Sequence, residues 1–137
     1  MPDPEKRRRL IELITPQDEA CGVPLVTPAE FFDGNDDLGS IGCNLTDHPG
    51  LDVFKEVTDK LLALPGVDQV WIQIYDLEEG DWPFAENILV FGTVAPGDVA
   101  TLADEIMPSE VQEMQVDWTP SRVPSLAGRR YVNLWWD

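Results

Sequence analysis

The sequence has little of several residue types that common functional sites need. It contains two cysteines and one histidine among 137 residues. Two cysteines without a Cys-x-x-Cys spacing exclude a disulfide framework and a cysteine zinc site, and leave open whether Cys21 and Cys43 pair. A single histidine excludes sites that need two imidazoles. No apolar run approaches the roughly 20 residues of a membrane-spanning helix, and the start lacks the apolar segment of a secretory signal. We therefore expect a cytoplasmic protein without a membrane partner.

Positive charge is the scarcest feature of the chain. Nine Lys and Arg oppose 26 Asp and Glu, which gives a formal net charge of -17. Between residues 61 and 121 the sequence contains no Lys or Arg. So negative a surface repels the phosphates of nucleic acids and the headgroups of anionic lipids. We therefore expect no nucleic-acid partner.

An acidic loop falls inside this region without cations. Its carboxylates have no basic neighbour in the sequence: Asp76, Glu78, Glu79, Asp81 and Glu86. One interpretation is a solvated surface that keeps the protein soluble. The other is a surface that attracts a basic protein partner, because clustered charge of one sign raises the rate of association with a complementary protein.

The periodicity of the apolar residues predicts a domain of alternating helices and strands. Helical spacing predicts a helix over Pro49–Leu64, and alternation predicts a hairpin of strands over Gln69–Leu77 and Asn87–Val94. The other expected elements are a central strand at Ser40–Leu45, a helix opened by Pro96, a long connection at Pro108–Gly128 and a final strand at Arg129–Asp137. This order predicts an α+β fold of the ferredoxin-like type, in which two split β-α-β units pack their helices on one face of an antiparallel sheet.

The first 39 residues are left over from that pattern. They contain a helical segment at Glu5–Ile14 that should end before Pro16, because the residue preceding a proline disfavours helical angles. They also contain a capping box, in which Thr27 and Glu30 enclose the start of a short helix. We expect residues 1–39 to be a helical extension that packs on a domain formed by residues 40–137.

One face of the expected sheet gathers aromatic and amide side chains. Alternation places the following residues on the face away from the helices: Asn44, Trp71, Gln73, Tyr75, Asn133 and Trp135. A face so apolar needs cover, which the extension, a second copy of the chain in a homodimer, or a ligand could supply. The neighbouring Trp136 should point the opposite way, into the core.

A short acidic turn resembles part of a calcium loop. Asp33, Asn35 and Asp37 alternate as the ligands of a hard cation do. However, Leu38 occupies the position where such a loop needs glycine, and Asn44 occupies the position of its bidentate glutamate. We therefore predict an ordinary turn with no metal and no cofactor.

Catalytic patterns are equally scarce. Cys43 and His48 are the only nucleophile and base that could pair, and the expected fold directs them apart. The lack of a catalytic constellation and the excess of acid favour a non-enzymatic binding or regulatory protein for a basic partner, of which a toxin-neutralising immunity protein is one form. The alternative hypothesis is a small-molecule binding or enzymatic domain that uses the aromatic sheet face.

Two segments carry a resemblance to known sequences. Residues 30–45, Glu-Phe-Phe-Asp-Gly-Asn-Asp-Asp-Leu-Gly-Ser-Ile-Gly-Cys-Asn-Leu, and the terminal Trp-Trp-Asp resemble a group of small acidic bacterial proteins of uncharacterised function. The resemblance covers most of the chain from Val23 onward. It implies a bacterial source and brings no activity, cofactor or catalytic residue with it.

Overall fold

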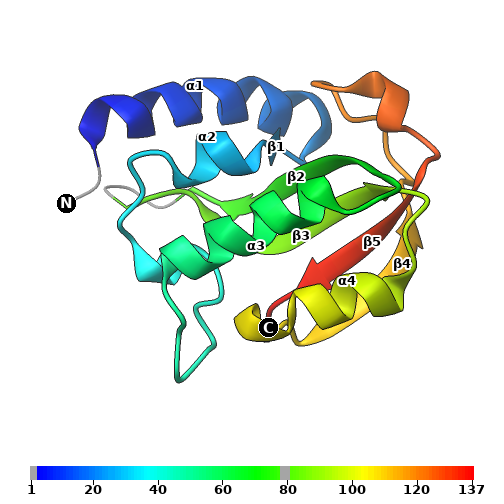
Figure 1. The fold of residues 1–137 in the computed structure, drawn as a ribbon. Helices are drawn as coiled ribbons and strands as arrows, with labels where there is room; N and C mark the ends of the chain where they lie inside the picture. The colour runs from blue at the N-terminus through cyan, green and yellow to red at the C-terminus, as the bar shows by residue number, and fades with distance from the viewer. Residues whose placement is uncertain (1–2, 78–80) are drawn as a thin grey trace.

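A computed structural model describes residues 3–77 and 81–137 of the chain. It contains an antiparallel sheet in the order β1-β2-β3-β5-β4, with helices packed against it (Figure 1). The strands are β1 (Leu25–Val26), β2 (Val67–Asp76), β3 (Phe84–Gly92), β4 (Glu110–Gln115) and β5 (Arg130–Trp135). The helices are α1 (Pro4–Cys21), α2 (Pro28–Phe32), α3 (Leu51–Ala63) and α4 (Pro96–Leu102), with 3-10 turns at Leu38–Ser40, Asp104–Ile106 and Pro124–Leu126. This architecture confirms the α+β class. None of the described helices is long and apolar enough to cross a membrane.

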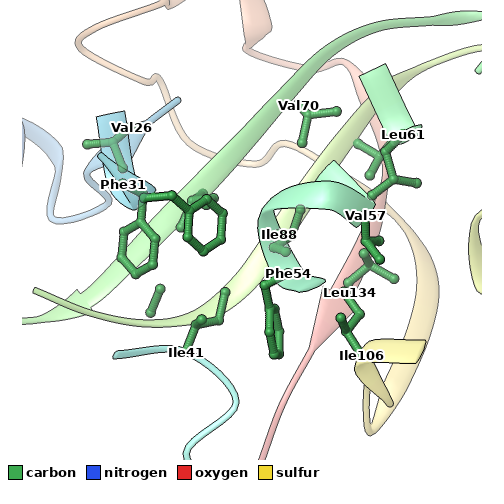
Figure 2. Close-up of a cluster of buried hydrophobic side chains, with 14 of the residues drawn as sticks. Val26, Phe31, Ile41, Phe54, Val57, Leu61, Val70, Ile88, Ile106 and Leu134 are labelled. Carbon is green, nitrogen blue, oxygen red and sulfur yellow. The ribbon is translucent and has the colours of Figure 1, made fainter. Parts of the chain in front are cut away.

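The main core lies between the sheet and its helices. Phe54, Val57 and Leu61 of α3 face Ile88 of β3 and Leu134 of β5 (Figure 2). Each of these side chains is almost fully buried, and burying a side chain of this size stabilises a fold by roughly 1.5–3 kcal/mol. The apolar residues at helical spacing in α3 and at alternate positions in the strands are therefore the ones that meet in this core.

Trp136 enters the same core, as the strand alternation predicts. Its side chain is 2% exposed, and its indole N–H donates to the Ile106 carbonyl at 2.7 Å. The ring lies 5.5 Å from that of Phe54, measured between centroids. The adjacent Trp135 points to the opposite face of the sheet, because successive side chains of a strand alternate. The terminal tryptophans thus contact both sides of β5.

The predicted central strand at Ser40–Leu45 is wrong. Residues 38–40 form a 3-10 turn, and Ile41 makes a single isolated bridge to Ala85 of β3. Gly42 has φ of +67°, and a Cβ placed there would lie 2.8 Å from the Phe54 ring, so the chain turns at this residue. Ile41 is buried while Cys43 is exposed, and an alternation of three residues does not distinguish a strand from such a loop.

Because the central strand does not form, the strand order of the sheet differs from the predicted ferredoxin-like order. β5 occupies the place beside β3 that the central strand was expected to take. β4 then lies outside β5, in the segment predicted to be a loop. Its sequence Glu-Val-Gln-Glu-Met-Gln is polar and largely exposed on both faces, so no alternation marks it as a strand.

The first helix is longer than predicted. α1 runs through Pro16 to Cys21. Pro16 lies on the exposed side of the helix, where water can hydrate the carbonyl that its missing N–H leaves free. Beyond it, the buried Gln17 is bonded to β1, and this tertiary contact holds the last turns in place. The extension also supplies β1 to the sheet and Phe31 to the main core, and the capping box of Thr27 and Glu30 at the start of α2 is confirmed.

Candidate functional site

The face of the sheet away from the helices carries four of the six aromatic and amide side chains expected there. Register places Gln73, Asn87, Trp135 and Glu110 in one row across β2, β3, β5 and β4. A second row contains Trp71, Leu89, Asn133 and Gln112. Trp71, Gln73, Asn133 and Trp135 therefore share a face, as the sequence predicts.

Residues 116–128 cover one end of this face. Val116 and Leu126 are buried in a second apolar cluster with Phe91 and Tyr131, against which Trp118 also packs. This loop therefore covers part of the face for which the extension, a second copy of the chain and a ligand were the three expected covers. The extension covers the opposite side instead, because its helices contribute side chains to the core beneath α3.

Arg122 fixes this covering loop to the sheet. Its guanidinium carbon lies 5.1 Å from the centre of the Trp71 ring and its nitrogens donate to both oxygens of Glu30, at 2.7 and 2.9 Å. Burial raises the pKa of Glu30, but the hydrogen bonds from Arg122 and from the Thr27 amide outweigh this and lower the pKa overall. The Glu30 carboxylate therefore stays ionised. The face of the Trp71 ring already contacts a cation of the same chain, the Arg122 guanidinium.

The middle of the face is a polar floor. Asn87 donates from Nδ2 to Oδ1 of Asn133 at 3.0 Å, and Asn133 is 9% exposed. The indole N–H of Trp135 lies 3.5 Å from Oε2 of Glu86. Asn87 occupies the position between β2 and β5 that was expected for Asn44.

Three carboxylates lie at the uncovered end of the sheet. Asp76 is the last residue of β2, Glu86 directly precedes Asn87 on β3, and Glu110 is opposite Trp135 at the start of β4. We call Asp76, Glu86 and Glu110 the acidic end. Asp76 and Glu86 belong to the predicted acidic loop, whereas Glu110 belongs to neither predicted site and lies opposite Trp135 of the sheet face.

A hollow of about 260 Å³ opens beside the acidic end where β1 stops and β2 continues. Its lining combines apolar side chains with Asp18 of α1 and with Tyr75 and Asp76 of β2. The Tyr75 side chain is 65% exposed, and its ring meets Phe84 edge-on at 5.8 Å between centroids. An exposed ring beside two carboxylates forms a wall that suits a cationic side chain.

The cations of the chain are already engaged elsewhere. Lys and Arg side chains form internal ion pairs with the following partners: Lys6 with Asp33, Arg8 and Arg9 with Glu5, Lys55 with Asp59, Lys60 with Glu56, Arg122 with Glu30, Arg129 with Asp68 and Arg130 with Glu113. Arg7 donates to the Asp81 carbonyl at 2.6 Å. Within residues 3–77 and 81–137, Asp18, Asp76 and Glu110 pair with none of these cations.

Asn44 and the middle of the predicted acidic loop do not belong to the acidic end. Asn44 lies exposed in a turn outside the sheet, so its placement on the sheet face is wrong. Asp81 is exposed, and Glu78 and Glu79 lie outside the described residues. Sequence reasoning could have found Asn87, because it is the one amide residue of the predicted strand and stands directly before an apolar run. Asp18 carried no sequence signal, since only the packing of α1 beside β1 brings it to the hollow.

Side chains of the acidic turn accept hydrogen bonds from backbone amides of the same turn. Asn35 accepts from the Asp37 amide, Asp37 accepts from the Gly39 amide, and Asp33 pairs with Lys6. In the described part of the chain, no three His, Cys, Asp or Glu side chains gather as a metal site would require. The loop therefore has the geometry of capped turns.

His48 likewise serves the backbone. Its Nε2–H donates to the Ile41 carbonyl at 2.8 Å, and its Nδ1 accepts from the Gly50 amide at 3.0 Å. Both nitrogens are thus occupied by backbone groups in the loop before α3. Although Cys43 is exposed, partial desolvation by neighbouring protein atoms and the carboxylate of Glu86 raise the pKa of its thiol, which weakens it as a nucleophile. Cys21 and Cys43 are both free thiols.

The sequence comparisons place the chain in a family. Residues 5–134 match the family model described as the uncharacterized protein YfbO family. The chain belongs to the YfbO family. It is 32% identical over 116 residues to the uncharacterized protein YfbO of Escherichia coli, and the match covers 83% of each chain. This membership confirms the resemblance to an uncharacterised bacterial group. No solved structure matches the chain.

Proposed function

We propose that this protein is a non-enzymatic acidic binding protein that recognises a basic protein partner through the acidic end of its sheet. One observation carries the proposal. Internal ion pairs and the carbonyl of Asp81 engage the chain's cations, while Asp18, Asp76 and Glu110 have no cationic partner among the described residues. The side chains of residues 3–77 and 81–137 therefore leave the negative charge of this end without a cationic partner.

Unmatched carboxylates favour association with a basic surface for two reasons. The charge of carboxylates that no cation of the fold pairs is neutralised when a partner's Lys or Arg side chains approach them. Their combined field also attracts a basic protein before contact. The exposed Tyr75 ring adds a surface on which a cation can stack. A regulatory or immunity-type role is one form that such binding takes.

The alternative of a small-molecule site on the sheet face has less support. Arg122 already stacks on Trp71, and residues 116–128 cover the apolar part of the face. What stays uncovered is a flat row of amides beside carboxylates. A small-molecule site is typically a concave, mostly apolar pocket with few polar groups. The uncovered row fits a protein contact better.

The proposal is tested with a defined basic probe. We suggest a fluorescent peptide of about eight residues that alternates Lys and Val, titrated at low salt and followed by anisotropy. The acidic-end variant combines Asp76→Asn, Glu86→Gln and Glu110→Gln. Its affinity should fall about tenfold, which corresponds to roughly 1.4 kcal/mol of lost binding free energy.

A matched variant separates the site from net charge. It removes the same number of negative charges at exposed positions elsewhere, by Glu19→Gln, Asp47→Asn and Asp52→Asn. This control should lose no more than about twofold in affinity, because distant surface charges are largely screened. Equal losses of peptide affinity in the two variants would show that binding depends only on the net charge of the protein. The proposed site would then be wrong.

A further inference from the structure

One long side of β4 pairs with no strand among the residues that the structure describes. β4 is the last strand in the sheet order, and Val116, which follows it, donates its amide to the Arg129 carbonyl at 2.9 Å. Hydrogen-bonded residues alternate along an antiparallel ladder. Val111, Glu113 and Gln115 therefore direct their backbone amides and carbonyls away from β5. No hydrogen bond between described residues reaches these outward groups.

The opposite edge of the same sheet is closed. Gln17 of α1 accepts from the Leu25 amide at 2.9 Å and donates to the Leu25 carbonyl at 3.0 Å, as a neighbouring strand would. Arg122 adds a second donor to that carbonyl at 3.2 Å. Both outward groups of Leu25 are thus satisfied by side chains. In the described part of the chain, the fold closes one sheet edge and leaves outward backbone groups of the other edge without a hydrogen-bond partner.

β4 lacks most of the features that block strand addition. Edge strands are commonly protected by proline, lysine, bulges or a covering loop. β4 is six residues long, contains no Pro or Lys, and is regular in its pairing with β5. Its side chains are exposed except for the half-buried Val111. The strand can therefore accept an extended segment by main-chain hydrogen bonds.

The charges around β4 select the occupant. Glu110 and Glu113 lie on the strand, and Asp104 and Glu105 lie in the 3-10 turn just before it. The nearest cation on β5, Arg130, is already paired with Glu113. A second copy would bring the same acidic edge and its own net charge of -17, whereas a basic segment is complementary to this edge.

We infer that β4 binds an extended basic segment of the partner, which adds to the sheet as a sixth strand beside β4. This inference rests on the proposed function and supplies its mode of binding. A side chain of the added strand opposite Glu110 prolongs the row that Gln73, Asn87 and Trp135 begin. Directly opposed side chains in an antiparallel pair lie about 4.5–5.5 Å apart at Cβ, so a Lys or Arg there meets the Glu110 carboxylate.

Amide hydrogen exchange of the full chain with the alternating Lys–Val peptide tests the added strand residue by residue. The amides of Val111, Glu113 and Gln115 should exchange at least about tenfold more slowly when the peptide is bound. Those of Gln112 and Met114 should change little, since they already face β5. Protection that skips every second residue is the signature of strand pairing, which attraction between charges alone does not produce.

A proline substitution provides an independent test. Gln115→Pro removes an outward amide while keeping the inward ladder, and proline is tolerated on edge strands. Gln115→Ala is the matched control, because it removes the same side chain and keeps the amide. Peptide affinity should fall about tenfold for Gln115→Pro and stay within about twofold for Gln115→Ala. A peptide N-methylated at alternate residues should bind the unmodified protein about tenfold more weakly.

The outcomes separate this inference from the proposed function. If the acidic-end variant loses affinity but the β4 amides gain no alternating protection, strand addition is wrong and basic-partner binding stands. If the alternating protection appears while the acidic-end and control variants bind equally, the edge is used but the acidic end does not select the partner. Concentration-dependent self-association through the β4 amides, without peptide, would overturn the basic occupant in favour of a second copy.

Discussion

The two edges of the sheet differ in a way that strand length does not explain. β1 has only two residues, yet Leu25 is completely buried and its outward backbone groups are bonded to Gln17. β4 has six residues and is almost entirely exposed. An edge is therefore closed by what packs across it, here α1 and the loop that carries Arg122. Substitutions at the contacts that close the β1 edge should therefore destabilise the protein more than substitutions on β4.

Gln17→Met should cause the largest loss, about 2–3 kcal/mol of unfolding free energy. The variant keeps a side chain of similar length but leaves the buried Leu25 amide without an acceptor, and an unsatisfied buried group costs about 1–3 kcal/mol. Chemical denaturation measures the change. The matched substitution on the other edge, Gln112→Met, should change stability by less than about 0.5 kcal/mol. Equal effects at the two positions would contradict the contrast between the edges.

Glu30→Gln should cost less, about 1–2 kcal/mol, because the pair with Arg122 is only partly buried. The substitution keeps the shape of the side chain and removes the charge that receives two guanidinium hydrogen bonds. It also loosens the loop that brings Arg122 to the Leu25 carbonyl. Thermal unfolding gives the change in stability, and Glu12→Gln on the exposed side of α1 serves as the control. If Glu30→Gln lost no more stability than Glu12→Gln, the loop would be held by apolar contacts alone.

The stability difference between the unmodified protein and Glu30→Gln should depend on pH. The pKa of Glu30 is lowered from its ordinary value of 4.5, so the folded state favours the ionised carboxylate. A lowered pKa contributes stability above the unfolded-state value, and that contribution is lost as the pH falls through the folded-state value. The difference should be constant near neutral pH and shrink below about pH 4.5. A difference that grows on acidification would mean that the protonated form is the one stabilised.

Hydrogen exchange of the free protein should distinguish the edges without any substitution. The Leu25 amide should exchange slowly despite the length of β1, because Gln17 accepts its hydrogen bond. The Glu113 amide should exchange at a rate close to that of an exposed loop, since it has no acceptor among the described residues. Slow exchange at Glu113 would reveal cover over β4 in solution and would remove the basis for strand addition there.

Local sequence patterns were sufficient where an element buries one regular face. α3 and the hairpin of β2 and β3 follow their apolar periodicity, and the α2 capping box reads directly from Thr27 and Glu30. Trp136 follows the alternation of β5 into the core. In each case the residues that set the local conformation also contact the core, so local and tertiary preferences agree.

The patterns failed where a distant contact decides the conformation. α1 passes Pro16 because Gln17 is bonded to β1 on the other side of a turn. Residues 41–48 turn instead of extending, because Gly42 lies against Phe54 and His48 bonds the Ile41 carbonyl. β4 forms because β5 offers it a partner, although its own side chains show no alternation.

The candidate site divides in the same way. The sequence alone determined the excess of acid, the stretch without cations, and the alternation that puts Trp71, Gln73, Asn133 and Trp135 on one face. Only the tertiary structure decided that Arg122 covers Trp71, that Glu110 joins Asp76 and Glu86 at one end, and that one sheet edge is closed while the other is open. Charge and periodicity are properties of residues in order along the chain. Neutralisation and edge closure depend on which distant residues the fold brings within a few ångströms, and local patterns do not encode that distance.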